Sequence, residues 1–186
     1  MHFPLVKNFI DGKWVDSTSG ALLDQHDPAD LTRVTCRFQR SSREDALRAI
    51  DAAEAAFESW ASTPAPRRAE ILTRALAAIE RRKEEIANVI TTENGKTLRE
   101  SLGEIASAIN EMGWQIGEGR RLYGETVPSE REGVFAYCIR QPLGVVSIVS
   151  PWNFPFNVPC RKCTPALMAG NTVVFKPASL TPRTGA

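Results

Sequence analysis

The stretch "GVVSIVSPWNFPFNVPCRKC" (residues 144–163), followed closely by "NTVVFKP" (171–177), decides the fold. Residues 144–151 are apolar on both faces, which is typical of a central parallel strand. The segment 171–177 has the same character, and residues 155–169 between the two fit a helix. Strand, helix and strand at this spacing predict a βαβ unit with a right-handed crossover. The last third of the chain therefore predicts an α/β fold, the start of a doubly wound parallel sheet.

The preceding two thirds predict a helical region with short antiparallel strands. Asp11-Gly12 within "NFIDGKWVDS" (8–17) favours a hairpin, since both residues of a type I′ turn take positive φ. "DLTRVTCRFQR" (30–40) alternates and predicts a half-buried strand. "GVFAYCIRQPLG" (133–144) alternates too, and we expect an exposed antiparallel strand that Pro142 ends.

Three helices are predicted between residues 41 and 120. The second is expected to run without a break to Gly95, which suits a left-handed cap. The third carries an apolar stripe at helical spacing from Leu98 to Ile116, which indicates a packing seam. The start signals, in chain order, are a capping box of Ser41 with Glu44, the prolines 64 and 66, and a capping box of Thr97 with Glu100.

Composition excludes several classes of partner. Of 186 residues, 23 are basic and 22 acidic, so the net charge of +1 provides no field for nucleic acid or for an anionic membrane. No apolar run approaches the roughly 20 residues of a membrane span. Four cysteines are too few for a disulfide scaffold, so we expect reduced thiols and a cytoplasmic location.

Two polar side chains follow the two predicted parallel strands. Asn153 lies between Pro151 and Pro155, which stiffen the loop, and Lys176 ends the next strand. In open α/β sheets, ligands bind beyond the carboxyl ends of the strands. A fixed amide there suits stabilisation of developing negative charge, and an ammonium suits ribose hydroxyls or phosphate. The alternatives are that Asn153 only caps the following helix and that Lys176 is only solvated.

"PWNFP" (151–155) followed by "AGNTVVFKPAS" (169–179) closely resembles the aldehyde dehydrogenase superfamily. "FIDGKWV" (9–15), "ENGKTLRES" (93–101) and "RQPLGVVSIVSPWNFP" (140–155) extend the resemblance over essentially the whole chain, in the order of the family. The resemblance implies a dehydrogenase with an NAD or NADP cofactor and a small-molecule aldehyde substrate.

The resemblance also implies a role for individual residues. Asn153 matches the oxyanion-hole asparagine, and Lys176 matches the lysine that holds the adenosine ribose, with Ala178 and Ser179 beside it. The residues that match the wall along the cofactor are Ile148, Val149, Ser150, Pro151 and Trp152. The implied chemistry is thiolate attack on an aldehyde, hydride transfer to the cofactor and hydrolysis of a thioester.

The nucleophilic cysteine and the general-base glutamate of the family are expected beyond residue 186, and none of the four cysteines here matches the nucleophile. Cys160 and Cys163 form a CxxC on the predicted helix, which is weak support for a metal site or a redox pair, so no metal is expected. We expect the chain to be the front part of a longer protein, without a catalytic domain and inactive alone. Its parts would be residues 1–124, an oligomerisation-type strand at 125–143 and the first βαβ unit at 144–186.

Two residues bear on specificity. Many NAD-preferring members of the family carry a glutamate at the position of Ser179, so the neutral serine favours NADP, with an unchanged preference for NAD as the alternative. Arg161 lies where the semialdehyde branch of the family has an arginine that contacts the substrate's acid group; a surface ion pair is the alternative.

We expect the complete enzyme to be a homodimer or homotetramer. A truncated, catalytically silent interaction module is the second functional hypothesis.

Overall fold

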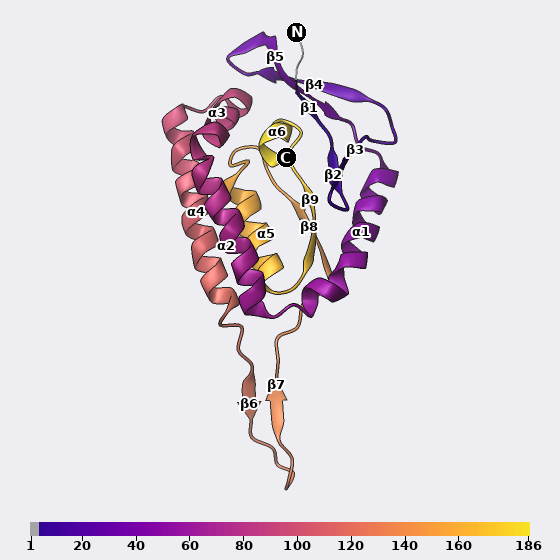
Figure 1. Ribbon diagram of the computed structural model, residues 1–186, viewed down its shortest axis with the longest axis vertical. Coiled ribbons are helices and arrows are strands. Elements are labelled where there is room, and N and C mark those ends of the chain that lie inside the picture. Colours follow the sequence, from indigo (N-terminus) through magenta and orange to yellow (C-terminus); the bar gives the residue numbers. More distant parts are fainter. Residues whose placement is uncertain (1–3) are drawn as a thin grey trace.

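The computed structural model describes residues 4–186 as a body of helices and short strands from which one hairpin projects (Figure 1). At the N-terminus, β1 (Leu5–Val6) pairs in parallel with β5 (Asp30–Gln39), which pairs on its other side with β4 (Leu22–Asp27) in antiparallel orientation. The predicted hairpin is present as β2 (Asn8–Ile10) and β3 (Lys13–Val15). Its turn residues Asp11 and Gly12 have φ of 51° and 71°, which confirms the positive φ expected of this pair.

The alternation predicted for residues 30–40 holds only in part. Cys36 is buried and Arg37 is exposed, but Thr35 is buried as well. Gln25 pairs with Cys36, and His26 pairs with Val34, so Thr35 is an extra residue opposite no partner. Such a β-bulge turns a side chain to the other face, which a strict period of two does not predict.

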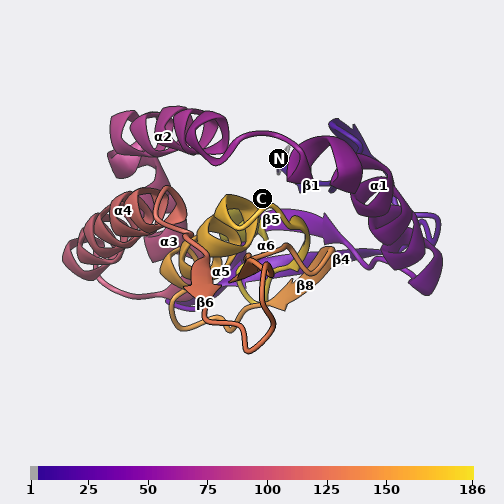
Figure 2. The ribbon, with the colours of Figure 1, turned by 90° about the horizontal axis from the view of Figure 1, so that it is seen from below.

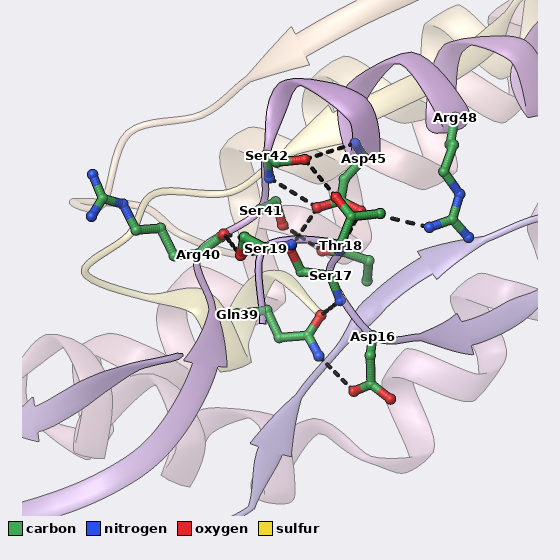
Figure 3. A network of polar contacts seen from close by, with 11 residues as sticks. Asp16, Ser17, Thr18, Ser19, Gln39, Arg40, Ser41, Ser42, Asp45 and Arg48 are labelled. Carbon is green, nitrogen blue, oxygen red and sulfur yellow. Dashed lines mark hydrogen bonds and ion pairs between the residues drawn. The ribbon is translucent and has the colours of Figure 1, made fainter. Parts of the chain in front are cut away.

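The first helix, α1 (Arg43–Ala61), begins one residue later than predicted. Its capping box is Ser42 with Asp45, not Ser41 with Glu44. Asp45 is selected because its carboxylate is buried and also accepts hydrogen bonds from Ser17 Oγ at 2.5 Å and from Thr18 N at 3.1 Å (Figure 3). This network ties the segment after β3 to the start of α1.

The predicted second helix is two helices, so the expectation of an unbroken helix was wrong. α2 (Ala65–Arg81) and α3 (Lys83–Asn94) meet at Arg82, whose backbone leaves the helical region at φ −105° and ψ 12°. Ile79 before the break and Ile86 and Ile90 after it all pack into one apolar cluster. The apolar stripe therefore continues through the break, which is why periodicity gave no sign of it.

The remaining helix signals are confirmed. Gly95 ends α3 with φ 83°, and the capping box of Thr97 with Glu100 begins α4 (Leu98–Gly119). Ile105 joins Ala87 and Ile90 of α3 in one buried cluster, whereas Ile116 joins Ala69 and Leu72 of α2 in another. The stripe of α4 is thus the seam between α4 and the two helices that precede it.

After α4, the chain forms an antiparallel hairpin of β6 (Glu125–Val127) and β7 (Ala136–Cys138) that extends away from the body (Figure 1). The exposed antiparallel strand predicted for 133–144 is therefore present, although only three of its residues pair. Phe135 and Tyr137 are 74% and 62% exposed, with ring centroids 5.8 Å apart. Both large side chains are therefore in contact with solvent on the projecting hairpin.

The predicted βαβ unit is present at the end of the chain. β8 (Val145–Val149) and β9 (Thr172–Lys176) pair in parallel, and α5 (Asn157–Met168) connects them. α5 packs against α4 and α2 on one side (Figure 2) and against β8 and β9 on the other, and α1 lies beyond the two strands (Figure 1). Ile148 is buried but Ser147 and Val149 are exposed, so one face of β8 is open among residues 4–186, unlike a central strand. A short helix, α6 (Pro182–Gly185), follows β9.

Candidate functional site

The parallel register brings the two predicted polar residues to one edge of the sheet. Val149, the last residue of β8, lies opposite Lys176, the last residue of β9. Ser150 N then donates to Lys176 O at 3.3 Å. The loop that carries Asn153 and the segment that begins at Lys176 therefore leave the sheet side by side, at its carboxyl end.

The loop after β8 presents its polar side chain to solvent. Asn153 is exposed between Trp152 and Phe154, which are 53% and 48% exposed, whereas Pro155 is buried and anchors the loop. Within residues 4–186, the Asn153 side chain makes no hydrogen bond of its own. The helix-cap alternative for Asn153 was wrong, because the N-cap position of α5 is Phe156.

The carboxylate of Glu104 on α4 caps α5 instead. Its Oε1 accepts hydrogen bonds from Phe156 N at 2.8 Å and Asn157 N at 3.0 Å, which satisfies two amides that a helix start leaves without partners. The Oε2 atom of the same carboxylate pairs with Lys96 at 2.6 Å. No local sequence pattern indicated this role of Glu104. The one sequence feature nearby is that Lys96 belongs to the "ENGK" segment (93–96), which is part of the family resemblance.

A pocket of about 310 Å³ opens beside this loop. Phe154 and Asn157 form its wall on the side of the loop and α5. The buried Asn157 Oδ1 has no hydrogen-bond partner within residues 4–186, although Asn157 Nδ2 donates to Ser107 Oγ at 3.1 Å. A small polar molecule would find an unused acceptor here. The lining residues are Lys96, Glu100, Gly103, Glu104, Ser107, Phe154 and Asn157.

The predicted cofactor residues divide by exposure. Val149, Pro151, Trp152, Lys176 and Ser179 are exposed, and Ala178 is half-buried. Lys176 Nζ donates only to Pro177 O, its own neighbour, so the charge is accessible to a ligand. By contrast, Ile148 and Ser150 are buried at 7% and 5% exposure, which leaves their side chains no direct access to solvent.

Arg161 lies on the exposed surface of α5. Its Nε is 3.8 Å from Glu111 Oε1 on α4, and both side chains are more than a third exposed. Such a long, solvated ion pair contributes little energy, so it leaves the guanidinium available to a ligand. The structure thus contains the ion pair of the alternative interpretation but does not exclude capture of a carboxylate.

The half-buried thiols of α5 are poor nucleophiles. Burial, then the neighbouring charge of Cys163, raises the pKa of Cys160 to about 12, and burial raises the pKa of Cys163 to about 11. Burial, then the charge of Glu93, likewise raises the pKa of Cys36 to about 12. Because a thiolate is the attacking species, none of the three is activated.

Two further findings concern the described residues as a whole. Residues 4–186 contain no group of three or more His, Cys, Asp or Glu side chains placed to hold a metal ion. None of the helices in this range combines the length and the apolar character that a bilayer crossing requires.

Comparison with known proteins identifies relatives over almost the whole chain. The model of the Aldehyde dehydrogenase family matches residues 14–186. Alpha-ketoglutaric semialdehyde dehydrogenase of Bacillus subtilis is 42% identical over 174 residues, which are 94% of this chain and 36% of that protein. D-glyceraldehyde dehydrogenase (NADP(+)) of Thermoplasma acidophilum is 41% identical over 178 residues, 95% of this chain and 36% of that protein.

A solved structure shares the fold. The crystal structure of an NADP dependent enzyme of E. coli superposes with a TM-score of 0.94 at 36% identity, over 98% of this chain and 37% of that one. This likeness confirms the predicted fold class. The chain thus spans little more than a third of the length of the relatives that it matches.

Proposed function

Because the chain belongs to the aldehyde dehydrogenase family, we propose that it forms the oxyanion-stabilising and cofactor-facing part of an enzyme that oxidises an aldehyde to the acid. The observation that carries the proposal is the register of β8 and β9. Because of this register, the exposed loop that carries Asn153 and the segment that begins at the exposed Lys176 both follow the carboxyl ends of two parallel strands, which supports the proposal. Ligands of open α/β sheets bind at this place.

Asn153 supplies the electrostatic part of catalysis. Attack on the aldehyde carbon turns the carbonyl oxygen into an oxyanion, and the Asn153 amide donates a hydrogen bond to it. The donor is pre-positioned, since the loop backbone is held by the side chains of Asn94, at the end of α3, and Lys96, in the turn before α4, so little reorganisation is needed when the charge develops.

The exposed residues at the strand ends fit a nicotinamide dinucleotide. Lys176 offers an ammonium to ribose hydroxyls, Trp152 and Val149 offer apolar surface, and Ser179 places no negative charge beside them. A nicotinamide cofactor bound by these residues would supply the hydride acceptor for oxidation at the aldehyde carbon. A neutral Ser179 tolerates a 2′-phosphate, and the names of the Thermoplasma relative and the E. coli structure both include NADP.

The nucleophile and the general base lie outside residues 1–186 in this proposal. The raised pKa values of Cys36, Cys160 and Cys163 support this assignment, because each of these thiols stays protonated at neutral pH. The remaining cysteine, Cys138, is on the projecting hairpin. The 186-residue chain alone would then bind parts of the ligands without turning over the aldehyde.

The substrate class is an ω-carboxylated semialdehyde. Arg161 lies about one turn into α5, the helix that follows the Asn153 loop, and its guanidinium suits bidentate capture of a carboxylate. The Bacillus relative is named for a semialdehyde of this kind.

The projecting β6–β7 hairpin would contact a second copy of the chain in a homodimer or homotetramer. Its exposed Phe135 and Tyr137 also favour the second candidate function, an interaction module without catalysis.

The test compares the natural protein, expressed over the whole length of its reading frame, with residues 1–186 alone. Each is mixed with NAD or NADP and succinate semialdehyde, and NAD(P)H is followed by absorbance at the reduced nicotinamide band. The proposal requires turnover by the natural protein and none by residues 1–186. Absence of turnover in both, with every aldehyde tried, would favour the interaction module.

A further inference from the structure

The α3–α4 turn, defined here as the last two residues of α3 with Gly95 and Lys96 (residues 93–96), holds the loop that carries Asn153. Asn94 Nδ2 donates to Trp152 O at 2.7 Å, and Lys96 Nζ donates to Asn153 O at 2.8 Å. Two consecutive carbonyls of the loop are therefore fixed by two side chains of one turn. Gly95 between them adopts φ 83°, and a Cβ there would come within 2.7 Å of Pro28, so only glycine fits.

Lys96 is itself held in place on several sides. Its ammonium pairs with Glu104 Oε2 at 2.6 Å, and the two side chains are only 14% and 1% exposed. The same ammonium lies 4.7 Å from the centre of the Phe154 ring. A partly desolvated ion pair with a cation–π contact is screened little by solvent, so it constrains Lys96 strongly.

Glu104 extends the constraint to the other end of the loop. Because its Oε1 accepts from Phe156 N and Asn157 N, one carboxylate joins Lys96 to the start of α5. Residues 153–157 are thus held at both ends by a single ion pair, and Asn153 is the first residue of this segment.

The neighbouring Glu93 fixes the turn to the segment after β9. Its carboxylate accepts hydrogen bonds from Arg183 N at 2.7 Å, Thr184 N at 2.7 Å and Thr184 Oγ1 at 2.6 Å. One turn therefore contacts the chain beyond both parallel strands, which carry the proposed oxyanion donor and the proposed ribose ligand.

We propose that Lys96, supported by Glu104, is a positioning residue that sets the direction of the Asn153 amide by holding its backbone carbonyl. This inference rests on the proposed function, since it assigns how the proposed oxyanion donor is aimed. Lys96 acts through Asn153 and leaves substrate binding largely to other residues. Its loss should lower kcat more than it changes KM.

The test is a double-mutant cycle in the natural protein, with kcat and KM measured for the aldehyde. Lys96→Met should lower kcat on the order of 10- to 100-fold, because a small misplacement of a catalytic group has effects of this size. In the Asn153→Ala background, Lys96→Met should lower kcat less than about twofold, since the group that it aims is gone. Lys7→Met is the matched control, because Lys7 also forms an ion pair, with Asp16 at 2.9 Å, and its side chain makes no hydrogen bond to the loop within residues 4–186.

Lys96→Met leaves the buried Glu104 carboxylate without its partner, so the melting temperature is recorded for every variant. If Lys96→Met does not fold, Asn94→Ala is used in its place. It removes the hydrogen bond to Trp152 O and leaves no buried charge without a partner. It should lower kcat in the same direction by a smaller factor, and again only when Asn153 is present.

Equal loss of kcat with and without Asn153 would overturn the inference, as would an unchanged kcat in Lys96→Met when Asn153→Ala is impaired. If the natural protein oxidises no aldehyde, or if Asn153→Ala keeps full kcat, the proposed function fails and the inference fails with it. These outcomes are distinguishable, because the Asn153→Ala single variant tests the proposed function alone.

Discussion

Val149 and Lys176 are register partners in the parallel pair of β8 and β9. Because both strands end at this pair, the Asn153 loop and the segment that begins at Lys176 leave the sheet side by side. Neither residue is near the other in sequence, yet both motifs of the family resemblance meet at this pair. The geometry of the candidate site depends on this pairing.

Asp45 should make the protein sensitive to acid. Burial would raise the pKa of this carboxyl, but hydrogen bonds from Ser17, Ser42 and Thr18 outweigh burial and lower the pKa to about 2, from the usual 3.8. Because the folded-state pKa is the lower one, the stabilisation is complete above about pH 4 and is lost as the pH falls through about 2. Asp45→Ala should lower the free energy of unfolding by about 1–3 kcal/mol at pH 7.

Urea unfolding of wild type and Asp45→Ala at several pH values checks this. The difference in the free energy of unfolding should shrink as the pH falls from 4 to 2, and Asp51→Ala, an exposed site on the same helix, should show no such difference. A difference that is independent of pH would contradict the assignment.

Ser179 should set the cofactor preference. Ser179→Glu places a negative charge where a 2′-phosphate would lie, so kcat/KM for NADP relative to NAD should fall roughly 100-fold or more. Ser179→Gln is the matched control, because it adds the same bulk without charge and should leave the ratio within a few fold. Steady-state kinetics with both cofactors measures the ratio, and an unchanged ratio in Ser179→Glu would reject the role.

Arg161 should recognise the acid end of the substrate. Arg161→Ala should raise KM for succinate semialdehyde about 10-fold or more, the value of a charged hydrogen bond, and leave KM for an uncharged aldehyde of similar length unchanged. Lys162→Ala, at the neighbouring exposed position, should leave both unchanged. If Arg161→Ala raised KM equally for both aldehydes, Arg161 would have only a structural role, in its ion pair with Glu111.

The sequence predicted features that have a pattern of their own in a short segment. It missed features that depend on contacts between distant segments. The Asp11-Gly12 turn and the Thr97 capping box depend on neighbours in the chain, and each is present. The βαβ unit is present as well, because each of its three elements has its own local pattern and the connection between them has a common length. β1 was missed because its two residues are ordered by pairing with β5, some thirty residues away. Likewise, no pattern near Ser41 shows that Asp45 is fixed by Ser17 and Thr18, so the capping box was misplaced by one residue.

The same distinction holds at the candidate site. Asn153 and Lys176 were found because proline-flanked and strand-end positions have a local signature. Lys96 and Glu104 were not, since their role depends on contacts with residues about 50 positions away. A helical carboxylate such as Glu104 has no local pattern that separates it from a solvated residue, although it is almost completely buried here.

The central claim, that Asn153 stabilises an oxyanion, is tested most directly by kcat of Asn153→Ala in the natural protein. The account predicts a fall in kcat of roughly 10²–10³-fold, the usual effect of removing one oxyanion donor, with the melting temperature retained. Asn110→Ala, at an exposed position of α4, should keep full kcat. A kcat for Asn153→Ala equal to that of the wild type would contradict the account.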